Sequence, residues 1–159
     1  MFQLSIITVG SIKEDYLEKA LLEYKKRLSA FAKIDEISIK EERIMNEDSA
    51  SEIENALSRE GDKILSAIPS GASVVALCVE GKQYDSIELA SLLGKEIDKS
   101  GKLCFIIGSS HGLADKVKQR ADIKLSASKL TFPHQLMRVI LYEVLYRSFS
   151  IRAGKKYHK

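Results

Sequence analysis

Short apolar runs alternate with longer amphipathic stretches along the whole chain. Runs rich in β-branched and apolar residues predict strands at residues 5–9, 34–39, 73–79 and 103–107, with a shorter fifth strand at 123–126. Helical spacing of apolar residues appears at 14–31, from about 48 to 68, from 85 to about 101, and at 134–152. Because strands and helices alternate, the sequence predicts an α/β domain with a mostly parallel sheet.

Capping residues support two of these helix starts. Asp48 or Ser49 can cap the second helix, which Pro69 would stop. Asp85, followed three residues later by Glu88, has the spacing of a capping box for the third helix.

The last predicted helix is apolar on nearly every side, which indicates burial on two sides. At the end of a small sheet domain, a second subunit supplies that second cover most simply, so we expect a homodimer packed through this helix. Glu143 and Arg147 are four residues apart and can pair along the helix, either as a structural ion pair or as a pair beside a substrate. The apolar positions are Leu136, Val139, Ile140, Leu141, Val144, Leu145 and Phe149.

Length and composition place the chain among ordinary globular proteins. Its 159 residues predict one domain, 1–159, and 45% hydrophobic with 30% charged residues gives no sign of disorder. We see no signal peptide, and the longest uncharged run, 64–79, is too short to span a membrane. Cys78 and Cys104 lie in apolar strand-like runs, as buried thiols do, so we expect a cytoplasmic protein with no disulfide framework.

Charge is distributed unevenly, although the net charge is only +3. Residues 129–159 carry +6, and residues 1–128 carry −3. A basic end on a mildly acidic body is typical of a polyanion contact, but a solvated tail explains the charge equally well.

One motif suggests a serine hydrolase. Residues 108–112, Gly-Ser-Ser-His-Gly, fit G-x-S-x-G after an apolar strand, with Ser110 at the nucleophile position. Acids and histidines follow in the required order, but the chain is short for such a hydrolase and no HGGG-like segment is present. We therefore expect Ser110 to lie in a ligand-binding turn and to attack nothing.

Three strand-end loops contain small and hydroxyl residues: LCVEGK, IIGSSHG and SASKLTFPH. Small residues let a ligand approach backbone N–H groups at the carboxyl ends of parallel strands, so together the loops predict a pocket for a flat polar group. Singly, each loop is equally well explained as an ordinary turn. The histidines, His111, His134 and His158, are too widely spaced to predict a metal site.

The segment SASKLTFPHQLMRVILYEVLYRSFSIRAGKKYHK, together with IITVGSIKEDYLEKALLEYKKRL, LCVEGK and IIGSSHGL, resembles the RlmH-type ribosomal RNA methyltransferases of the SPOUT class over essentially the whole chain. The resemblance implies a parallel sheet whose C-terminal part forms a trefoil knot, and an obligate dimer. It also implies S-adenosylmethionine as the methyl donor, no metal, and N3 of a pseudouridine in helix 69 of 23S rRNA as the acceptor. Two alternatives remain: a SPOUT methyltransferase with another RNA target, and a non-catalytic ribosome-binding protein.

The resemblance assigns residues to both substrates. The donor would contact Leu77, Gly108, Ala127, Ser128, Lys129, Leu130, Thr131 and Phe132. The RNA or catalytic side would contain Glu143, Arg147, Tyr157 and His158. The N3 proton must be removed, and two alternatives remain for how this happens. His158 can act as a base, or positive potential from Arg147 and the tail can favour the anion.

Three further expectations follow from these motifs. A side chain placed at Gly108 should obstruct the donor and leave the fold largely intact. The terminal residues Tyr157, His158 and Lys159 should serve RNA and contribute little to the core. The family usually has an acid in place of Cys78 and a glycine in place of Ser109; because Leu77, Gly81 and Gly108 are retained, we expect the pocket to persist.

Overall fold

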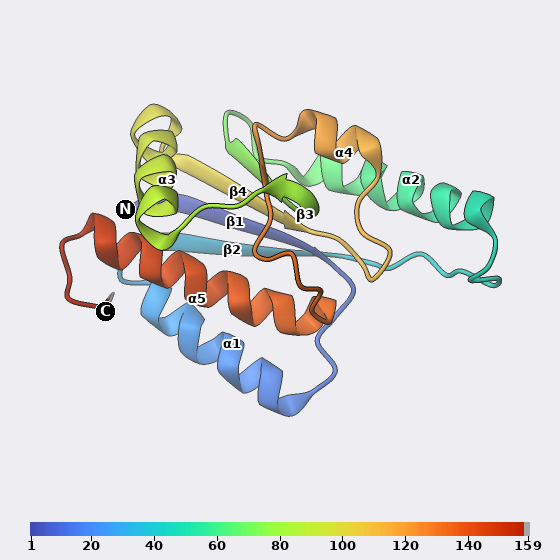
Figure 1. Cartoon of the computed structure of the whole chain (residues 1–159), viewed down its shortest axis with the longest axis horizontal. Helices are drawn as coiled ribbons and strands as arrows, with labels where there is room; N and C mark the ends of the chain where they lie inside the picture. The colour runs from blue at the N-terminus through green and yellow to red at the C-terminus, as the bar shows by residue number, and fades with distance from the viewer. Residues whose placement is uncertain (158–159) are drawn as a thin grey trace.

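A computed structural model describes residues 1–157 as alternating strands and helices. The elements are β1 (Phe2–Val9), α1 (Asp15–Leu28), β2 (Ala32–Ile39), α2 (Ala50–Ala67), β3 (Ser73–Lys82), α3 (Ser86–Ser100), β4 (Lys102–Ile107), α4 (Asp115–Arg120), β5 (Ile123–Leu125) and α5 (His134–Arg152). The strands form one sheet in the order β2-β1-β4-β3-β5, and every neighbouring pair is parallel (Figure 1). The predicted α/β class with a parallel sheet is confirmed.

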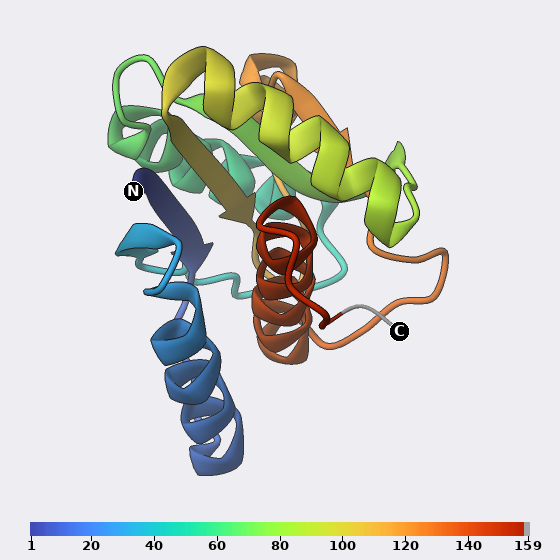
Figure 2. The ribbon, with the colours of Figure 1, turned by 90° about the vertical axis from the view of Figure 1, so that its left-hand side faces the viewer.

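The strands form this sheet because both of its faces are covered by helices. Side chains alternate along β4, so that Leu103 and Phe105 enter one core while Cys104 and Ile106 enter the other. The first core contains residues of α1, α3 and α5, and the second contains residues of α2 and α4. Both Figures 1 and 2 show α1 and α5 side by side, and α5 packs against α1 and α3.

Helix ends follow the local sequence. The Oγ of Ser49 accepts a hydrogen bond from the N–H of Glu52 at 3.3 Å, so Ser49 is the cap of α2. The capping box of α3 forms as predicted, because the side chains of Asp85 and Glu88 each accept from the other's backbone N–H. Within residues 1–157, no helix combines the length and apolarity that crossing a membrane requires.

The strand order determines where a ligand can approach. β1 leads through α1 to β2 on one side, whereas β4 leads through α4 to β5 on the other. The connections from the neighbouring strands β1 and β4 therefore lead toward opposite edges of the sheet. Open parallel sheets bind ligands at such a point, beyond the carboxyl ends of the strands. The loops after β1 and β4 and the start of α5 gather at this end of the sheet (Figure 1).

Two parts of the fold differ from the sequence prediction. Helix α4 was not predicted; it spans six residues, and only Val117 is buried, which is too short a pattern to show a period. Strand β3 was predicted to be fully buried to its end, but it continues to Lys82 and leaves its later residues open. Val79 is 66% exposed, and Cys78 is half-buried rather than a core thiol. Cys104 is buried as predicted.

Candidate functional site

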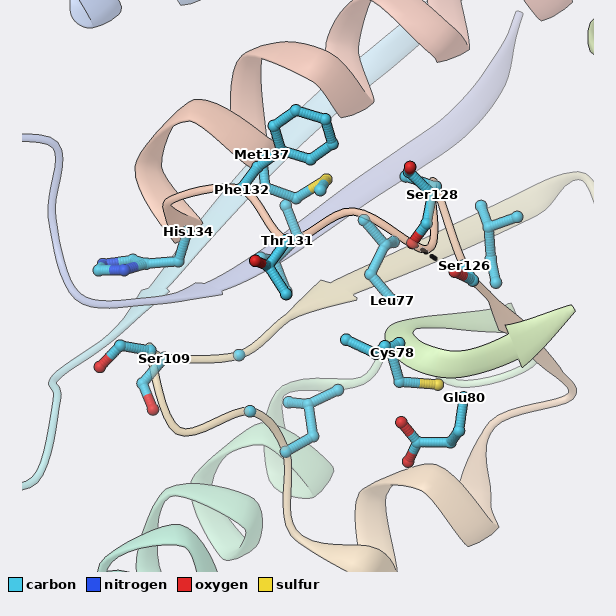
Figure 3. A pocket seen from close by; sticks show the side chains of 18 of the residues that line it. Leu77, Cys78, Glu80, Ser109, Ser126, Ser128, Thr131, Phe132, His134 and Met137 are labelled. Atoms are coloured by element: carbon cyan, nitrogen blue, oxygen red, sulfur yellow. Dashed lines mark hydrogen bonds between the residues drawn. The ribbon is translucent and has the colours of Figure 1, made fainter. Parts of the chain in front are cut away.

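The loops that follow β3, β4 and β5, together with the start of α5, line a cavity of about 650 Å³ (Figure 3). This volume is within the range of small-molecule sites, roughly 300–1,000 Å³. Most of the predicted donor-contacting residues line it, and Lys129 does not. Those that line it are Leu77, Gly108, Ala127, Ser128, Leu130, Thr131 and Phe132. The three predicted strand-end loops therefore do form one pocket.

Gly108 allows the tightest backbone approach in the cavity wall. A Cβ on Gly108 would lie 2.2 Å from the backbone oxygen of Gly112, and 2.6 Å from its carbonyl carbon. The turn closes through a hydrogen bond from the N–H of Gly112 to the oxygen of Ser109 at 2.9 Å. Glycine at 108 is thus required by the turn itself. The expectation that a side chain there would affect only a ligand is wrong, because the side chain would first displace the loop.

The loop after β5 is held in a fixed shape by its own serines. The hydroxyl of Ser126 donates to the backbone oxygen of Ser128 at 3.1 Å, and the Oγ of Ser128 accepts from the N–H of Leu130 at 3.0 Å (Figure 3). The end of β3 lies against the end of β5, where this loop begins, since a Cβ on Gly81 would meet the carbonyl carbon of Leu125 at 2.6 Å. Gly81 is therefore needed for the close contact of β3 with β5.

One ion pair borders the cavity. The ammonium of Lys118, on α4, lies 2.5 Å from the carboxylate of Glu80, and this contact lowers the pKa of Glu80 and raises that of Lys118. The side chain of Cys78 lies beside Glu80 (Figure 3), and burial raises the pKa of its thiol. Sequence reasoning missed Lys118 because the short helix that carries it gives no periodic signal. His134 and Met137 also line the cavity, from the first turn of α5.

Ser110 lacks the surroundings of a nucleophile. A nucleophile elbow is a strained turn, but within residues 1–157 only glycines have a positive φ. The imidazole of the adjacent His111 points elsewhere, with Nε2 2.7 Å from the carboxylate of Glu47. The carboxylate of Asp122, one acid considered for a triad, accepts the N–H of Val74 at 2.8 Å. Ser110 is exposed at the rim of the cavity, as a turn residue is.

The residues predicted for the RNA or catalytic side form a separate cluster on α5. Arg147 donates from Nε and Nη2 to one oxygen of Glu143, at 3.0 and 2.7 Å. The hydroxyl of Tyr157 donates to the other oxygen at 2.9 Å, and Tyr24 also hydrogen-bonds to Glu143. Burial alone would raise the pKa of Glu143, but these hydrogen bonds outweigh it and hold the pKa below its ordinary value. Burial and the bond to Glu143 raise the pKa of Tyr24 to about 12.

Tyr157 is more firmly packed than its position near the chain end suggested. Its ring contacts Tyr146 edge to face at 4.7 Å between centroids, and the guanidinium of Arg147 lies 4.9 Å from its centroid. Tyr157 therefore packs on α5, although it belongs to neither of the two core clusters. His158, predicted for the same cluster, and Lys159 lie outside the described residues.

None of Glu143, Arg147 and Tyr157 lines the donor-sized cavity. Met137 does line it, and Arg147 follows ten residues later, about 15 Å further along the helix at the usual rise of ~1.5 Å per residue. Arg147 instead lines a smaller groove of about 210 Å³, which adjoins the cavity and shares with it Leu77, Leu125, Ser126, Ala127 and Met137. No group of His, Cys, Asp or Glu within residues 1–157 could hold a metal ion.

Comparison with known proteins places this chain in a family. Residues 2–158 match a family described as predicted SPOUT methyltransferases. The chain is a SPOUT methyltransferase. In this methyltransferase, the glycine turn at Gly108 and the loop 126–134 are the walls of the main cavity.

Relatives of similar length share about half of the sequence. The "Ribosomal RNA large subunit methyltransferase H" of Caldicellulosiruptor bescii is 50% identical, with 98% of this chain and 99% of that protein covered. Proteins of the same name from Bacillus pumilus and Clostridioides difficile are 49% and 45% identical over the same shares of each chain. The predicted resemblance to RlmH-type enzymes is confirmed.

Two solved structures share the fold at low sequence identity. A probable methyltransferase from Bordetella pertussis Tohama I has a TM-score of 0.60 and 13% identity, covering 92% of this chain and 94% of that one. A probable methylase family protein from Haemophilus influenzae Rd KW20 has a TM-score of 0.55 and 12% identity, covering 100% of this chain and 72% of that one.

The environment of Ser110 leads to a simple prediction. Ser110→Ala should retain methyl transfer within about two-fold, because among the described residues, 1–157, the hydroxyl has no acid or histidine partner and lies at the edge of the cavity. Initial rates of methyl transfer to ribosomes would measure this. A drop to background in a variant with unchanged thermal unfolding would restore the nucleophile hypothesis.

Proposed function

We propose that this SPOUT methyltransferase transfers a methyl group from S-adenosylmethionine to large-subunit ribosomal RNA, at N3 of a pseudouridine in helix 69 of 23S rRNA. The observation that carries the proposal is the cavity at the carboxyl ends of β3, β4 and β5, lined by the loops to which the family resemblance assigns the donor. The names of relatives up to 50% identical over nearly the whole chain support the RNA substrate.

The cavity residues fit a donor with a flat heterocycle and a polar tail. Leu77, Leu130 and Phe132 offer apolar surface, while the loop around Ser126 and Ser128 offers backbone groups fixed by its own hydrogen bonds. A preformed site of this kind binds without first ordering its loops. We assign the donor to this cavity, with Thr131 directed into it (Figure 3).

The chemistry asks little of the protein beyond placement. When bound in the cavity, S-adenosylmethionine would supply an electrophilic methyl group and its own leaving group, so that beyond placement the protein would have to provide only for the loss of the N3 proton to a base or to water. The residues must hold N3 in line with that methyl group, which is a gain in proximity and orientation. Arg147, kept in a fixed orientation by Glu143 and Tyr157, provides positive potential that favours the N3 anion.

The proposed assembly is a homodimer packed through α5. In the single chain, Leu136, Val139, Ile140 and Val144 of this helix are only partly buried. Val79 and Leu130, which line the cavity, are 66% and 71% exposed, and Ile87 on α3 is 60% exposed. Large apolar side chains left open to solvent are typical of an interface when they lie together. The proposed dimer buries them.

A two-fold dimer would also combine the two halves of the site. If two α5 helices pack across a two-fold axis perpendicular to them, they run antiparallel. The start of one helix, beside its cavity, then lies next to the end of the other, which carries Arg147 and Tyr157. Each active site would therefore use the donor cavity of one subunit and the Glu143 cluster of its partner.

The proposal includes the trefoil knot of the family. Strand β5 follows β4 in the chain but pairs with β3 on the side away from β4, so the connection between β4 and β5 crosses over β3. The chain then returns to place α5 against α1, beside the first strand. These two crossings are consistent with a knotted C-terminal part. The proposed setting is the cytoplasm, where ribosomes are assembled and modified.

The proposed function has a direct test. Calorimetry should show S-adenosylhomocysteine binding at one site per chain, and sedimentation at low micromolar concentration should show a dimer. Mass mapping of rRNA from a strain lacking the gene should show a missing methyl group at the helix 69 pseudouridine, restored by adding the purified protein. Donor binding with methylation at another nucleotide would change the target, and no donor binding would indicate a ribosome-binding protein instead.

A further inference from the structure

A second cavity lies at the carboxyl ends of β1 and β2, next to the donor cavity. It has a volume of about 360 Å³ and is lined by Gly10, Ser11, Lys13, Ser38, Ile39, Lys40, Glu41, His134 and Gln135. His134 lines both cavities, so the two spaces meet at the start of α5. The connections from β1 and β4 lead toward opposite edges of the sheet, and this cavity lies beside the ligand position expected at such a point of an open parallel sheet.

The floor of this second cavity is held in place by a buried arginine. Arg138 is 6% exposed and donates from Nη2 to the backbone oxygens of Val9 and Gly10, both at 2.8 Å. The hydroxyl of Ser38 donates to the same oxygen of Gly10 at 3.1 Å. Gly10 has a φ of +83°, a conformation that favours glycine. The end of β1 is therefore fixed before any ligand arrives.

One wall of the second cavity is fixed to α5. The backbone N–H of Lys13 donates to Oε1 of Gln135 at 3.1 Å, joining the loop after β1 to the first turn of the helix. The other wall is the end of β2, where the N–H of Gly10 donates to the oxygen of Ile39 at 2.8 Å. The loop that contains Lys13 and the strand end that leads to Lys40 are therefore both fixed, and both lysines line the cavity.

The charges of the cavity indicate the ligand. The side chains of Lys13 and Lys40 are exposed, and neither ammonium has an ion pair or hydrogen bond within residues 1–157. Two unpaired ammonium groups with the hydroxyl of Ser11 are suited to a phosphate group. The carboxylate of Glu41, at the same cavity, can accept from a ribose 2′-hydroxyl or a base N–H, which a free phosphate lacks. Together they suit one nucleotide of an RNA strand.

On the basis of the proposed function, we infer that the second cavity binds a nucleotide of the RNA strand beside the methyl-accepting base, with Lys13 and Lys40 on its phosphate. The cavity positions the strand so that the neighbouring base reaches the donor across His134. Lys13 and Lys40 are positioning residues, because they touch the RNA away from the reacting atoms. Their removal should weaken RNA binding and leave the donor cavity unchanged.

The test compares two pairs of substitutions. Lys13→Ala with Lys40→Ala removes the charges of the cavity. Lys19→Ala with Lys33→Ala is the matched control, since both lysines are exposed. Lys33 lies at the start of β2, paired with Gln3, whereas Lys40 directly follows the other end of that strand. Methylation of ribosomes is measured against ribosome concentration at several salt concentrations, and calorimetry measures S-adenosylhomocysteine affinity.

For the cavity pair, KM should rise about ten-fold at ~0.15 M salt, and the slope of log KM against log salt should fall by about 2, one for each phosphate contact. The kcat and the donor affinity should stay within about two-fold of wild type. The control pair should behave as wild type. A KM and slope equal to wild type in the cavity pair, or equal losses in both pairs, would overturn the inference.

A failure of the proposed function would look different. In that case the wild-type protein itself would fail to methylate rRNA. The second cavity is then judged from fluorescence anisotropy with a labelled single-stranded RNA oligonucleotide, which needs no catalysis. Weaker binding by the cavity pair than by the control pair would support the nucleotide site, whereas equal binding by wild type and both pairs would remove it.

Discussion

Gly108→Ala is expected to reduce S-adenosylhomocysteine affinity at least about 100-fold and to destabilise the protein by about 3 kcal/mol. The added Cβ would lie 2.2 Å from the backbone oxygen of Gly112, and backbone cannot move aside as a flexible side chain can. The turn must open to relieve that contact, and this turn forms one wall of the proposed donor cavity. Calorimetry gives the affinity. Thermal unfolding should show a melting temperature lower by roughly 10 °C for a chain of this size.

A second glycine in the same turn provides the control. Gly112 has a φ of +88°, and a Cβ there would meet nothing within 4 Å. Asparagine tolerates this backbone conformation, so Gly112→Asn should cost less than about 1 kcal/mol and retain most of the donor affinity. If Gly108→Ala binds the donor as tightly as Gly112→Asn does, the turn is not a wall of the donor site.

Regular periodicity explains which parts of the fold could be predicted from sequence. Helix α5 was predicted at 134–152, and it spans His134–Arg152, because nineteen residues contain several apolar repeats and follow a proline. Helix α4 has six residues and one buried side chain, so no period could be recognised. The exposed end of β3 has a different cause. Val79 continues an apolar run, but it lies beyond the helices that cover the sheet, at the edge of the cavity.

The loops of the main cavity could be predicted from their small residues and from family resemblance, but their contacts could not. The role of Gly108 within its own turn depends on how closely the backbone of Gly112, four residues later, returns to it, and no local pattern encodes that distance. Arg138 is one of a few charged residues in an otherwise apolar helix, and this pattern does not indicate its partners. Its bonds to the oxygens of Val9 and Gly10 join positions more than 120 residues apart, so sequence spacing carries no signal of them.

The proposed combination of two subunits in one active site leads to the second prediction. Thr131→Trp should fill the donor cavity, and Arg147→Ala should remove the guanidinium from the Glu143 cluster. Each substitution, present in both subunits, should reduce methylation of ribosomes at least about 100-fold, because each breaks both sites of a two-fold dimer. Sedimentation should show that both variants remain dimers.

The decisive measurement uses heterodimers purified through two different tags. With Thr131→Trp in one subunit and Arg147→Ala in its partner, one composite site combines an intact cavity with an intact cluster, so about half of wild-type turnover should return. With both substitutions in the same subunit and a wild-type partner, each composite site contains one damaged half, and turnover should stay near background. If each active site were instead built from a single chain, the two results would be exchanged. The stability cost of the substitutions is the same in both heterodimers, so the comparison isolates which subunit supplies Arg147.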